Sequence, residues 1–321
     1  MVTKRGQQVI AIEEHYWDAE VSASLSVADA GGPIALQERL LDMGELRLKE
    51  MDEAGIDIQV LSHAPPATQR MDPETSVALS TGANDRLADV VAAQPDRFAA
   101  FAALPTPDPK ASADELERAV TQLGFKGAMI HGLTDGVFFD DKRFWPVFER
   151  AAALDVPLYI HPAMPHPAVV DAYYKEYIED FPGFLTAGWG FTVETATAGI
   201  RIVLSGVLDA YPNTKIILGH MGEGLPFLLW RIDSALARPG NKAISFRDVF
   251  SEHFYITTSG NFSDPALLCS IQELGIDRVL FSIDWPFVAN DPGTEWMEGL
   301  HLNNEDKDKI LNGNAKKLLR M

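Results

Sequence analysis

Cysteine is almost absent from this chain, with Cys269 the single example among 321 residues. One thiol excludes an intramolecular disulfide and a zinc cluster built from several thiolates. Cys269 follows the apolar run Ala266-Leu267-Leu268, which predicts a helix interior and favours a packing role over that of a nucleophile. Other side chains must therefore carry any chemistry.

Long apolar runs and excess positive charge are missing as well. No run approaches the roughly 18 residues of a membrane span, and the N-terminus leads into a strand pattern without the apolar core of a signal peptide. Lys and Arg number 27 against 46 Asp and Glu, for a net charge of −19. Nucleic-acid phosphates and anionic lipid repel such a polyanion. We expect a cytoplasmic protein that binds neither nucleic acid nor membranes.

Short apolar runs alternate with longer amphipathic stretches along the whole chain. With 46% hydrophobic residues, 1–321 can form one domain around a large core. Strands are predicted at 9–12, 58–61, 99–103, 127–130, 158–160, 215–218, 254–257 and 278–282. Helices are predicted near 36–54, 74–94, 110–123, 141–154, 190–210, 224–237, 264–274 and 305–319. Eight alternating units predict an α/β fold of the (β/α)8 TIM-barrel class.

Polar residues that follow the predicted strands are the candidates for chemistry, because the carboxyl ends of barrel strands open into the active-site mouth. Metal-binding residue types follow four strands: Glu13 and His15, His161, His220, and Asp284. Glu13 and His15 are two residues apart, so both side chains share one face of an extended segment while Glu14 points away. A lone histidine at such a place is more often a satisfied loop residue, but the agreement of four strand ends favours a metal site.

The predicted ligands of that site are two carboxylates and two imidazoles, from Glu13, His15, His161 and Asp284. This set favours one Zn²⁺ or Mn²⁺ ion over copper or Mg²⁺ and leaves positions open for substrate oxygens. The ion would also supply the positive charge that a small anionic substrate needs. His220 is predicted as an acid/base group or substrate contact, oriented by Glu223 at the start of a helical stretch.

Several further residues are candidate substrate contacts, each with a structural alternative. His63 and His131 follow the second and fourth predicted strands and are equally consistent with pocket and packing roles. Arg231, in the helix after the sixth strand, can bind a carboxylate or form a structural ion pair. The candidates for packing against a substrate ring are Phe287, Trp189 and Phe191, with Tyr16 or Trp17 from the first loop.

Four motifs stand out: IEEH at 12–15, LGHMGEGLP at 218–226, WRID at 230–233 and FSIDWPF at 281–287. They resemble the amidohydrolase superfamily, and within it the aminocarboxymuconate-semialdehyde decarboxylase branch, with the closest likeness to γ-resorcylate (2,6-dihydroxybenzoate) decarboxylases. The resemblance implies an amidohydrolase-type barrel, one divalent metal on the four predicted ligands, a His220–Glu223 dyad beside it, and a homodimer or homotetramer. Those relatives carry Asn where this chain has His63 and His131, which leaves the substrate open.

The site and the resemblance together predict non-oxidative decarboxylation of an aromatic acid with a hydroxyl ortho to its carboxylate, since these two oxygens can chelate one ion. The expected proton donor to the ring carbon is Asp284, whose pKa must then be raised. Burial would raise that pKa and metal ligation would oppose it, so we expect weak ligation and coupling to His220 and Glu223.

Two other functions stay open. A hydrolase or hydratase would direct a metal-activated water at a lactone, ester or enol acid, with Asp284 or His220 as the base. A non-catalytic metal-binding barrel would need no proton donor and would leave the His220–Glu223 pair without a task. The fold class does not choose among the three.

Overall fold

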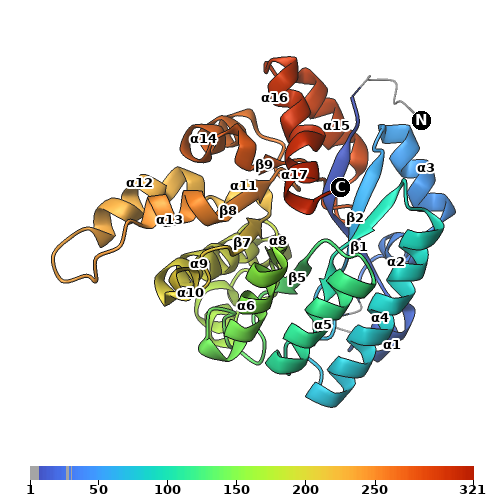
Figure 1. Cartoon of the computed structure of the whole chain (residues 1–321), viewed down its shortest axis with the longest axis horizontal. Coiled ribbons are helices and arrows are strands. Elements are labelled where there is room, and N and C mark those ends of the chain that lie inside the picture. Colours follow the sequence, from blue (N-terminus) through green and yellow to red (C-terminus); the bar gives the residue numbers. More distant parts are fainter. Residues whose placement is uncertain (1–6, 27–28, 30) are drawn as a thin grey trace.

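The computed structural model describes residues 7–26, 29 and 31–321, in which parallel strands stand inside a ring of helices (Figure 1). The strands are β1 (Ile10–Tyr16), β2 (Ile58–His63), β3 (Phe98–Ala100), β4 (Ala102–Ala103), β5 (Ala128–His131), β6 (Pro157–His161), β7 (Lys215–Leu218), β8 (Phe254–Thr257) and β9 (Val279–Leu280). They form two ladders, in the orders β1-β2-β3 and β4-β5-β6-β7-β8-β9.

The helices fill the intervals between the strands. The longer ones are α2 (Ile34–Leu41), α3 (Glu45–Ala54), α4 (Pro73–Ala93), α5 (Pro109–Gln122), α6 (Trp145–Leu154), α9 (Gly190–Ser205), α12 (Leu225–Leu236), α13 (Phe246–His253), α14 (Asp264–Leu274) and α15 (Asn290–Gly299). The shorter ones are α1 (Ala19–Ser24), η1 (Lys142–Phe144), α7 (Pro167–Val169), η2 (Val170–Tyr174), α8 (Pro182–Leu185), α10 (Val207–Ala210), α11 (His220–Glu223), η3 (Ile276–Arg278), α16 (Asn304–Asp308), η4 (Lys309–Gly313) and α17 (Asn314–Leu319).

Strands β3 and β4 are two halves of one barrel strand, interrupted at Phe101. The Phe101 amide donates to the Leu61 carbonyl at 2.9 Å, and the Ala102 amide donates to the Gly127 carbonyl at 2.9 Å. The first half therefore pairs with β2 and the second with β5, which joins the two ladders into a set of eight barrel strands. The predicted (β/α)8 class is confirmed.

Between β9 and β1 no ladder is present in the described ranges, and isolated hydrogen bonds cross instead. The Asp284 amide donates to the Glu13 carbonyl at 3.1 Å, and the His15 amide donates to the Trp285 carbonyl at 2.7 Å. We call this junction, formed by residues 13–15 and 282–285, the barrel seam. Three of the four predicted metal ligands lie in it.

Alternate residues of the strands divide between two cores, except where the pairing of β1 with β2 shifts between Ala11 and Glu14. Those facing inward, such as Ile12, Val60 and Ile217, pack in the barrel interior together with Leu318 and Leu319 of α17. Those facing outward pack against the surrounding helices. Because α17 fills the interior from the amino-terminal end of the strands, the carboxyl ends are left to form the site.

Some helix boundaries differ from the prediction for local reasons. The helix expected at 36–54 is two helices, because the Asp42 carboxylate accepts from the Gly44 and Arg47 amides and starts a new helix, α3. The helix expected at 190–210 breaks at Gly206, whose φ is 85°. The helices α13 and α15 were not predicted.

Cys269 is half-buried in α14, and burial raises the pKa of its thiol, which disfavours the nucleophilic thiolate.

Helices α12 and α13 project from one side of the barrel (Figure 1). Within the residues that the structure describes, no helix is both long and apolar enough to cross a bilayer.

We predict that Gly127→Ala lowers the free energy of unfolding by about 2 kcal/mol. An added methyl group would stand 2.3 Å from the Pro157 carbonyl oxygen of β6, and the φ of Gly127 is +147°. Urea denaturation followed by circular dichroism measures the change. Gly299→Ala is the control, because nothing lies within 4 Å of its added methyl group; equal stability of the two variants would contradict the prediction.

Candidate metal centre

The four predicted ligands converge at the carboxyl end of the barrel. Glu13 and His15 belong to β1, His161 ends β6, and Asp284 follows β9. Each offers one ligand atom, and these four atoms all lie within 4.8 Å of one another. His15 Nε2 is 3.2 Å from Asp284 Oδ1, and His161 Nε2 is 3.3 Å from Glu13 Oε1.

The atoms that face one another in this cluster lack other partners. Glu13 Oε1, His15 Nε2 and Asp284 Oδ1 are buried without a hydrogen bond among the described residues. Leaving buried polar atoms unpaired is costly unless something else satisfies them. Lone pairs from two carboxylates and two imidazoles suit Mn²⁺ or Zn²⁺, so the group can hold one divalent ion.

Neighbouring groups orient these ligands. His161 Nδ1 lies 2.7 Å from the Pro162 carbonyl oxygen, so Nδ1 carries the proton and Nε2 presents its lone pair to the cluster. Burial, followed by the nearby histidines, lowers the pKa of His161 well below its usual value, which favours the neutral imidazole that a metal binds. Ser62 Oγ lies 3.3 Å from His15 Nδ1 on the opposite side of that ring.

The second oxygen of Glu13 is held by hydroxyl groups that the sequence analysis did not single out. Tyr159 and Ser259 donate to Glu13 Oε2, and Thr257 donates to it at 3.1 Å. Tyr159 precedes His161 by two residues in β6 and therefore faces inward on the same side. The two-residue spacing between Tyr159 and His161 could therefore have identified Tyr159 as a neighbour of the metal ligands from the sequence.

His220 and Glu223 form the expected dyad, with His220 Nδ1 2.8 Å from Glu223 Oε1. His220 Nε2 stands 3.7 Å from both Glu13 Oε1 and Asp284 Oδ2. Glu223 precedes α12, as expected, and the backbone that leads into this helix is a left-handed turn in which His220, Met221 and Glu223 have φ values of 49°, 57° and 55°. This left-handed turn is costly for side chains other than glycine and is typical of functional sites.

The surroundings shift the pKa values of His220 and Asp284 in opposite directions. Burial lowers the pKa of His220, but Glu223 and Glu13 outweigh it and raise this pKa well above its usual value. Burial raises the pKa of Asp284, but the adjacent His15 and His220 imidazoles outweigh it and lower this pKa. The expectation of a raised pKa for Asp284 is therefore wrong, because the imidazole is favoured as the holder of the shared proton.

A pocket of about 640 Å³ opens over the cluster. His161, His220, Glu223 and Asp284 contribute to its lining, as do the predicted ring contacts Trp17, Trp189, Phe191 and Phe287. The Phe287 ring is 5.4 Å from the His15 ring, centroid to centroid. No Lys or Arg belongs to the described lining, so an anionic substrate would depend for its countercharge on a metal ion and on the protonated His220.

Three predicted substrate contacts do not belong to this lining. His63 faces the opposite side of β2 from Ser62, and the centroid of its ring lies 5.3 Å from that of the Tyr16 ring. Tyr16, another predicted ring contact, is outside the lining as well. His131 is buried beside the ligands, with its Nδ1 3.2 Å from His161 Nδ1. Arg231 is exposed on α12. Substrate-contact roles for these three residues stay predictions.

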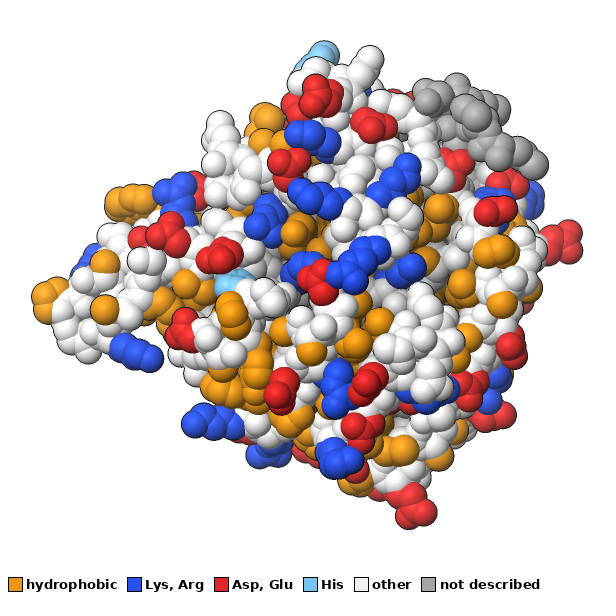
Figure 2. Space-filling model, viewed as in Figure 1, with side chains coloured by type: hydrophobic (Ala, Val, Ile, Leu, Met, Phe, Trp, Pro, Cys, Tyr) orange, Lys and Arg blue, Asp and Glu red, His pale blue; other side chains and the backbone are white. Residues whose placement is uncertain are grey.

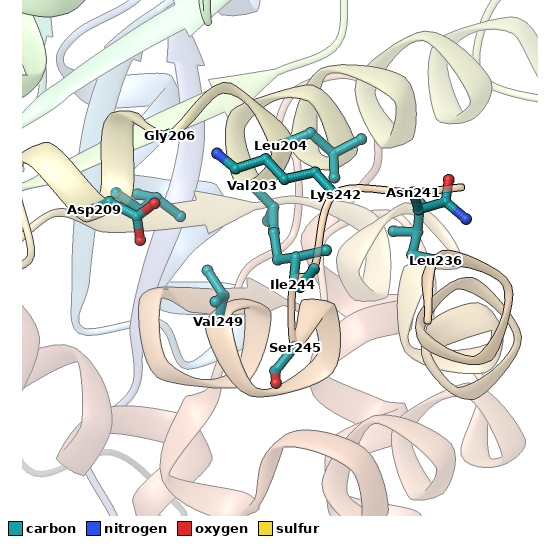
Figure 3. A pocket seen from close by; sticks show the side chains of 12 residues that line it. Val203, Leu204, Gly206, Asp209, Leu236, Asn241, Lys242, Ile244, Ser245 and Val249 are labelled. Carbon is teal, nitrogen blue, oxygen red and sulfur yellow. The ribbon is translucent and has the colours of Figure 1, made fainter. Parts of the chain in front are cut away.

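A second cavity, of about 440 Å³, lies between α9, α12 and the segment that leads into α13 (Figure 3). Its titratable lining residues among those described are Asp209 and Lys242. The rest of the labelled lining is mainly aliphatic, as at Val203, Leu236 and Val249. It contains no cluster of metal-binding or acid/base side chains that rivals the barrel mouth.

We predict that the protein binds one Mn²⁺ or Zn²⁺ ion per chain and that His161→Ala weakens this binding at least about 100-fold, since a ligand is lost from the site. Metal analysis after dialysis against a chelator buffer measures the loss. His301→Ala is the control, because His301 is an exposed residue outside the cluster. Equal metal content in the two variants would refute the assignment.

Comparisons with known proteins agree on one family. The family described as Amidohydrolase matches residues 12–321. The γ-resorcylate decarboxylase of Polaromonas sp. (strain JS666 / ATCC BAA-500) is 42% identical over 97% of this chain and 98% of its own length.

Two solved structures are similar over nearly the whole chain. A dihydroxybenzoic acid decarboxylase from Polaromonas sp. JS666, with bound manganese and 2-nitroresorcinol, has a TM-score of 0.90 and 41% identity, covering 98% of this chain and 97% of that one. A 2,6-dihydroxybenzoate decarboxylase complexed with 2,6-dihydroxybenzoate has a TM-score of 0.89 and 39% identity, covering 98% and 100%. By its matched length and its site, this chain belongs to the amidohydrolase family.

Proposed function

We propose that this protein is a metal-dependent decarboxylase, which removes CO₂ without oxidation from an aromatic acid that carries a hydroxyl ortho to its carboxylate. γ-Resorcylate or a similar hydroxybenzoate is the proposed substrate. The observation that carries the proposal is the cluster of Glu13, His15, His161 and Asp284 beside an aromatic-lined pocket. The similarity to decarboxylases over nearly the full chain supports it.

The pocket offers separate surfaces for the two ends of such a substrate. A divalent ion, when bound, supplies the positive charge that holds the carboxylate and ortho-hydroxyl oxygens. Phe287, next to the His15 ring, and Trp189 and Phe191, at the start of α9, offer faces and edges for the aromatic ring. A substrate ring packed against these side chains would displace water from the carbon that must be protonated.

Asp284 is the proposed proton donor to the ring carbon that bears the carboxylate. A new C–H bond forms there first, because direct loss of CO₂ would leave an aryl carbanion. The bond between the ring and the carboxylate then breaks, its electron pair restores the aromatic ring, and CO₂ departs. The product keeps the proton of Asp284, and one solvent proton restores the donor.

The His220–Glu223 dyad can keep that donor supplied. His220 Nε2 lies 3.7 Å from Asp284 Oδ2, and Glu223 holds the other ring nitrogen at 2.8 Å. A proton held on His220 can therefore return to Asp284 after each turnover, and the two groups titrate as a pair. This arrangement supports a donor role for Asp284 although its own pKa is lowered.

We further infer that the protein acts as a homodimer or homotetramer in the cytoplasm. The apolar side chains of Phe227 and Trp230 on α12 are 80% and 70% exposed, which is unusual for large apolar groups and supports a surface that another subunit covers.

On the face seen in Figure 2, basic side chains are interspersed with acidic ones. That pattern supports the expectation that nucleic acid is not a partner.

The proposed reaction is tested by incubating metal-loaded protein with a panel of dihydroxybenzoates and a panel of lactones. We expect CO₂ release from ortho-hydroxylated acids, with uptake of one proton for each CO₂ from a carboxylate substrate. Lactone opening without CO₂ from any acid would replace the decarboxylase by the hydrolase alternative. Failure to turn over either panel would favour the non-catalytic barrel.

We predict that Asp284→Asn lowers kcat for decarboxylation at least about 100-fold, because the amide cannot donate the proton. Hydrogen–deuterium exchange at the product ring carbon should be lost in parallel. Metal content is measured on the same sample, since Asp284 is also a proposed ligand. Asp277→Asn, in η3, serves as the control; near-normal turnover by Asp284→Asn with a full metal site would remove Asp284 from its role.

A further inference from the structure

Glu14 is a fully buried carboxylate that the proposed reaction does not use. It stands between the proposed ligands Glu13 and His15, and the alternation of β1 turns its side chain to the opposite face. Its Oε1 accepts hydrogen bonds from the Ile283 amide at 2.9 Å and from Ser282 Oγ at 3.0 Å. Its Oε2 accepts from the Trp285 amide at 3.1 Å.

These hydrogen bonds enclose the backbone of Asp284. The Ile283 and Trp285 amides stand on either side of it, and its own amide donates to the Glu13 carbonyl at 3.1 Å. Asp284 has a φ of 77°, a left-handed conformation that is unfavourable for a residue with a side chain. Such a conformation persists when its surroundings fix it, and three consecutive amides held by β1 do so.

The Glu14 carboxylate is also linked to Glu13 and His15, the other two ligands of the seam, through a network of hydrogen bonds. Ser282 Oγ accepts from the Glu13 amide at 2.6 Å while it donates to Glu14. The buried Arg47 donates to the His15 carbonyl at 2.6 Å and to Gln59 Oε1 at 3.1 Å. Gln59 Nε2 lies 3.5 Å from Glu14 Oε2.

Arg47 also carries the charge that opposes this buried carboxylate. Its guanidinium carbon lies 4.1 Å from the centroid of the Trp285 ring. A buried carboxylate without compensating donors and charge would be strongly unfavourable. The oxygens of Glu14 accept hydrogen bonds from the segment that carries Asp284. These bonds offset the cost of burying the carboxylate and hold that segment in a defined position.

We infer that Glu14 is a positioning residue for the metal centre, which fixes the separation of Asp284 from Glu13 and His15 across the barrel seam. The inference rests on the proposed metal ligands. At this seam two isolated backbone hydrogen bonds take the place of a strand ladder in the described residues, so the distance between the ligands also depends on the side-chain hydrogen bonds of Glu14. A purely structural role would change stability and leave metal affinity alone.

The test is Glu14→Gln, which keeps the shape of the side chain but replaces one acceptor oxygen by an NH₂ group that faces an N–H or O–H donor. We expect the dissociation constant for Mn²⁺ to rise about 10- to 100-fold, as for other groups that orient metal ligands. Chelator competition measures it under conditions where circular dichroism shows native folding. The Mn²⁺ electron paramagnetic resonance spectrum gives a second readout, and it should change with ligand geometry.

Glu115→Gln is the matched control. Glu115 is also a buried carboxylate, bonded to Asn84 at 2.7 Å and to Arg118 at 2.8 Å between α4 and α5. Its variant should lose stability and keep the Mn²⁺ dissociation constant within about twofold, because it does not touch the seam. Glu14→Gln with wild-type affinity and spectrum, whatever its stability, overturns the inference.

Ser282→Ala decides the matter if Glu14→Gln does not fold, because it removes one hydroxyl of the same network. We then expect Mn²⁺ affinity to fall at least about fivefold, toward the lower end of such effects, and an unchanged affinity overturns the inference. A wild-type protein that binds neither Mn²⁺ nor Zn²⁺ would instead overturn the proposed metal site, and this inference with it. The two failures are therefore distinguishable.

Discussion

The directions of the side chains at the end of β1, after its pairing with β2 shifts between Ala11 and Glu14, are the constraint on which the rest of the site depends. Glu13 and His15 face the barrel mouth, while Glu14 between them faces the seam and accepts hydrogen bonds from the segment that carries Asp284. A shift of one residue in the register of this strand would exchange the two faces. Glu13 and His15 would then no longer face the metal site, and Glu14 would no longer hold the segment that carries Asp284.

The two acid/base elements share a physical trait, a backbone in the left-handed region. His220 and Glu223 stand in one such turn, and Asp284 stands in another. Each is held from outside: Ser259 Oγ accepts from the His220 amide at 3.1 Å, and β1 holds the amides around Asp284. Strain that is fixed in this way presents side chains at angles that helices and strands do not offer.

Charge explains why such a site suits a cation and an anionic substrate together. Glu13, Glu14 and Asp284 bring carboxylates into a small buried volume, opposed within the described network by Arg47 and by His220. The described pocket lining lacks Lys and Arg, so a divalent ion is the natural counterpart of both the ligands and a substrate carboxylate. The strongly acidic chain, with its net charge of −19, needs such local compensation.

The sequence by itself determined the barrel class and brought Glu13, His15, His161, His220 and Asp284 to one mouth, because strand ends in a parallel barrel converge whatever the details of packing. It could not decide the direction of the pKa shift of Asp284, which depends on distances to His15 and His220. Nor could it separate His63, which turns toward Tyr16, from His131, which lies beside His161. The role inferred for Glu14 was invisible as well, since its partners stand about 270 residues away along the chain. Such contacts are set by how the last strand closes on the first, which only the tertiary structure decides.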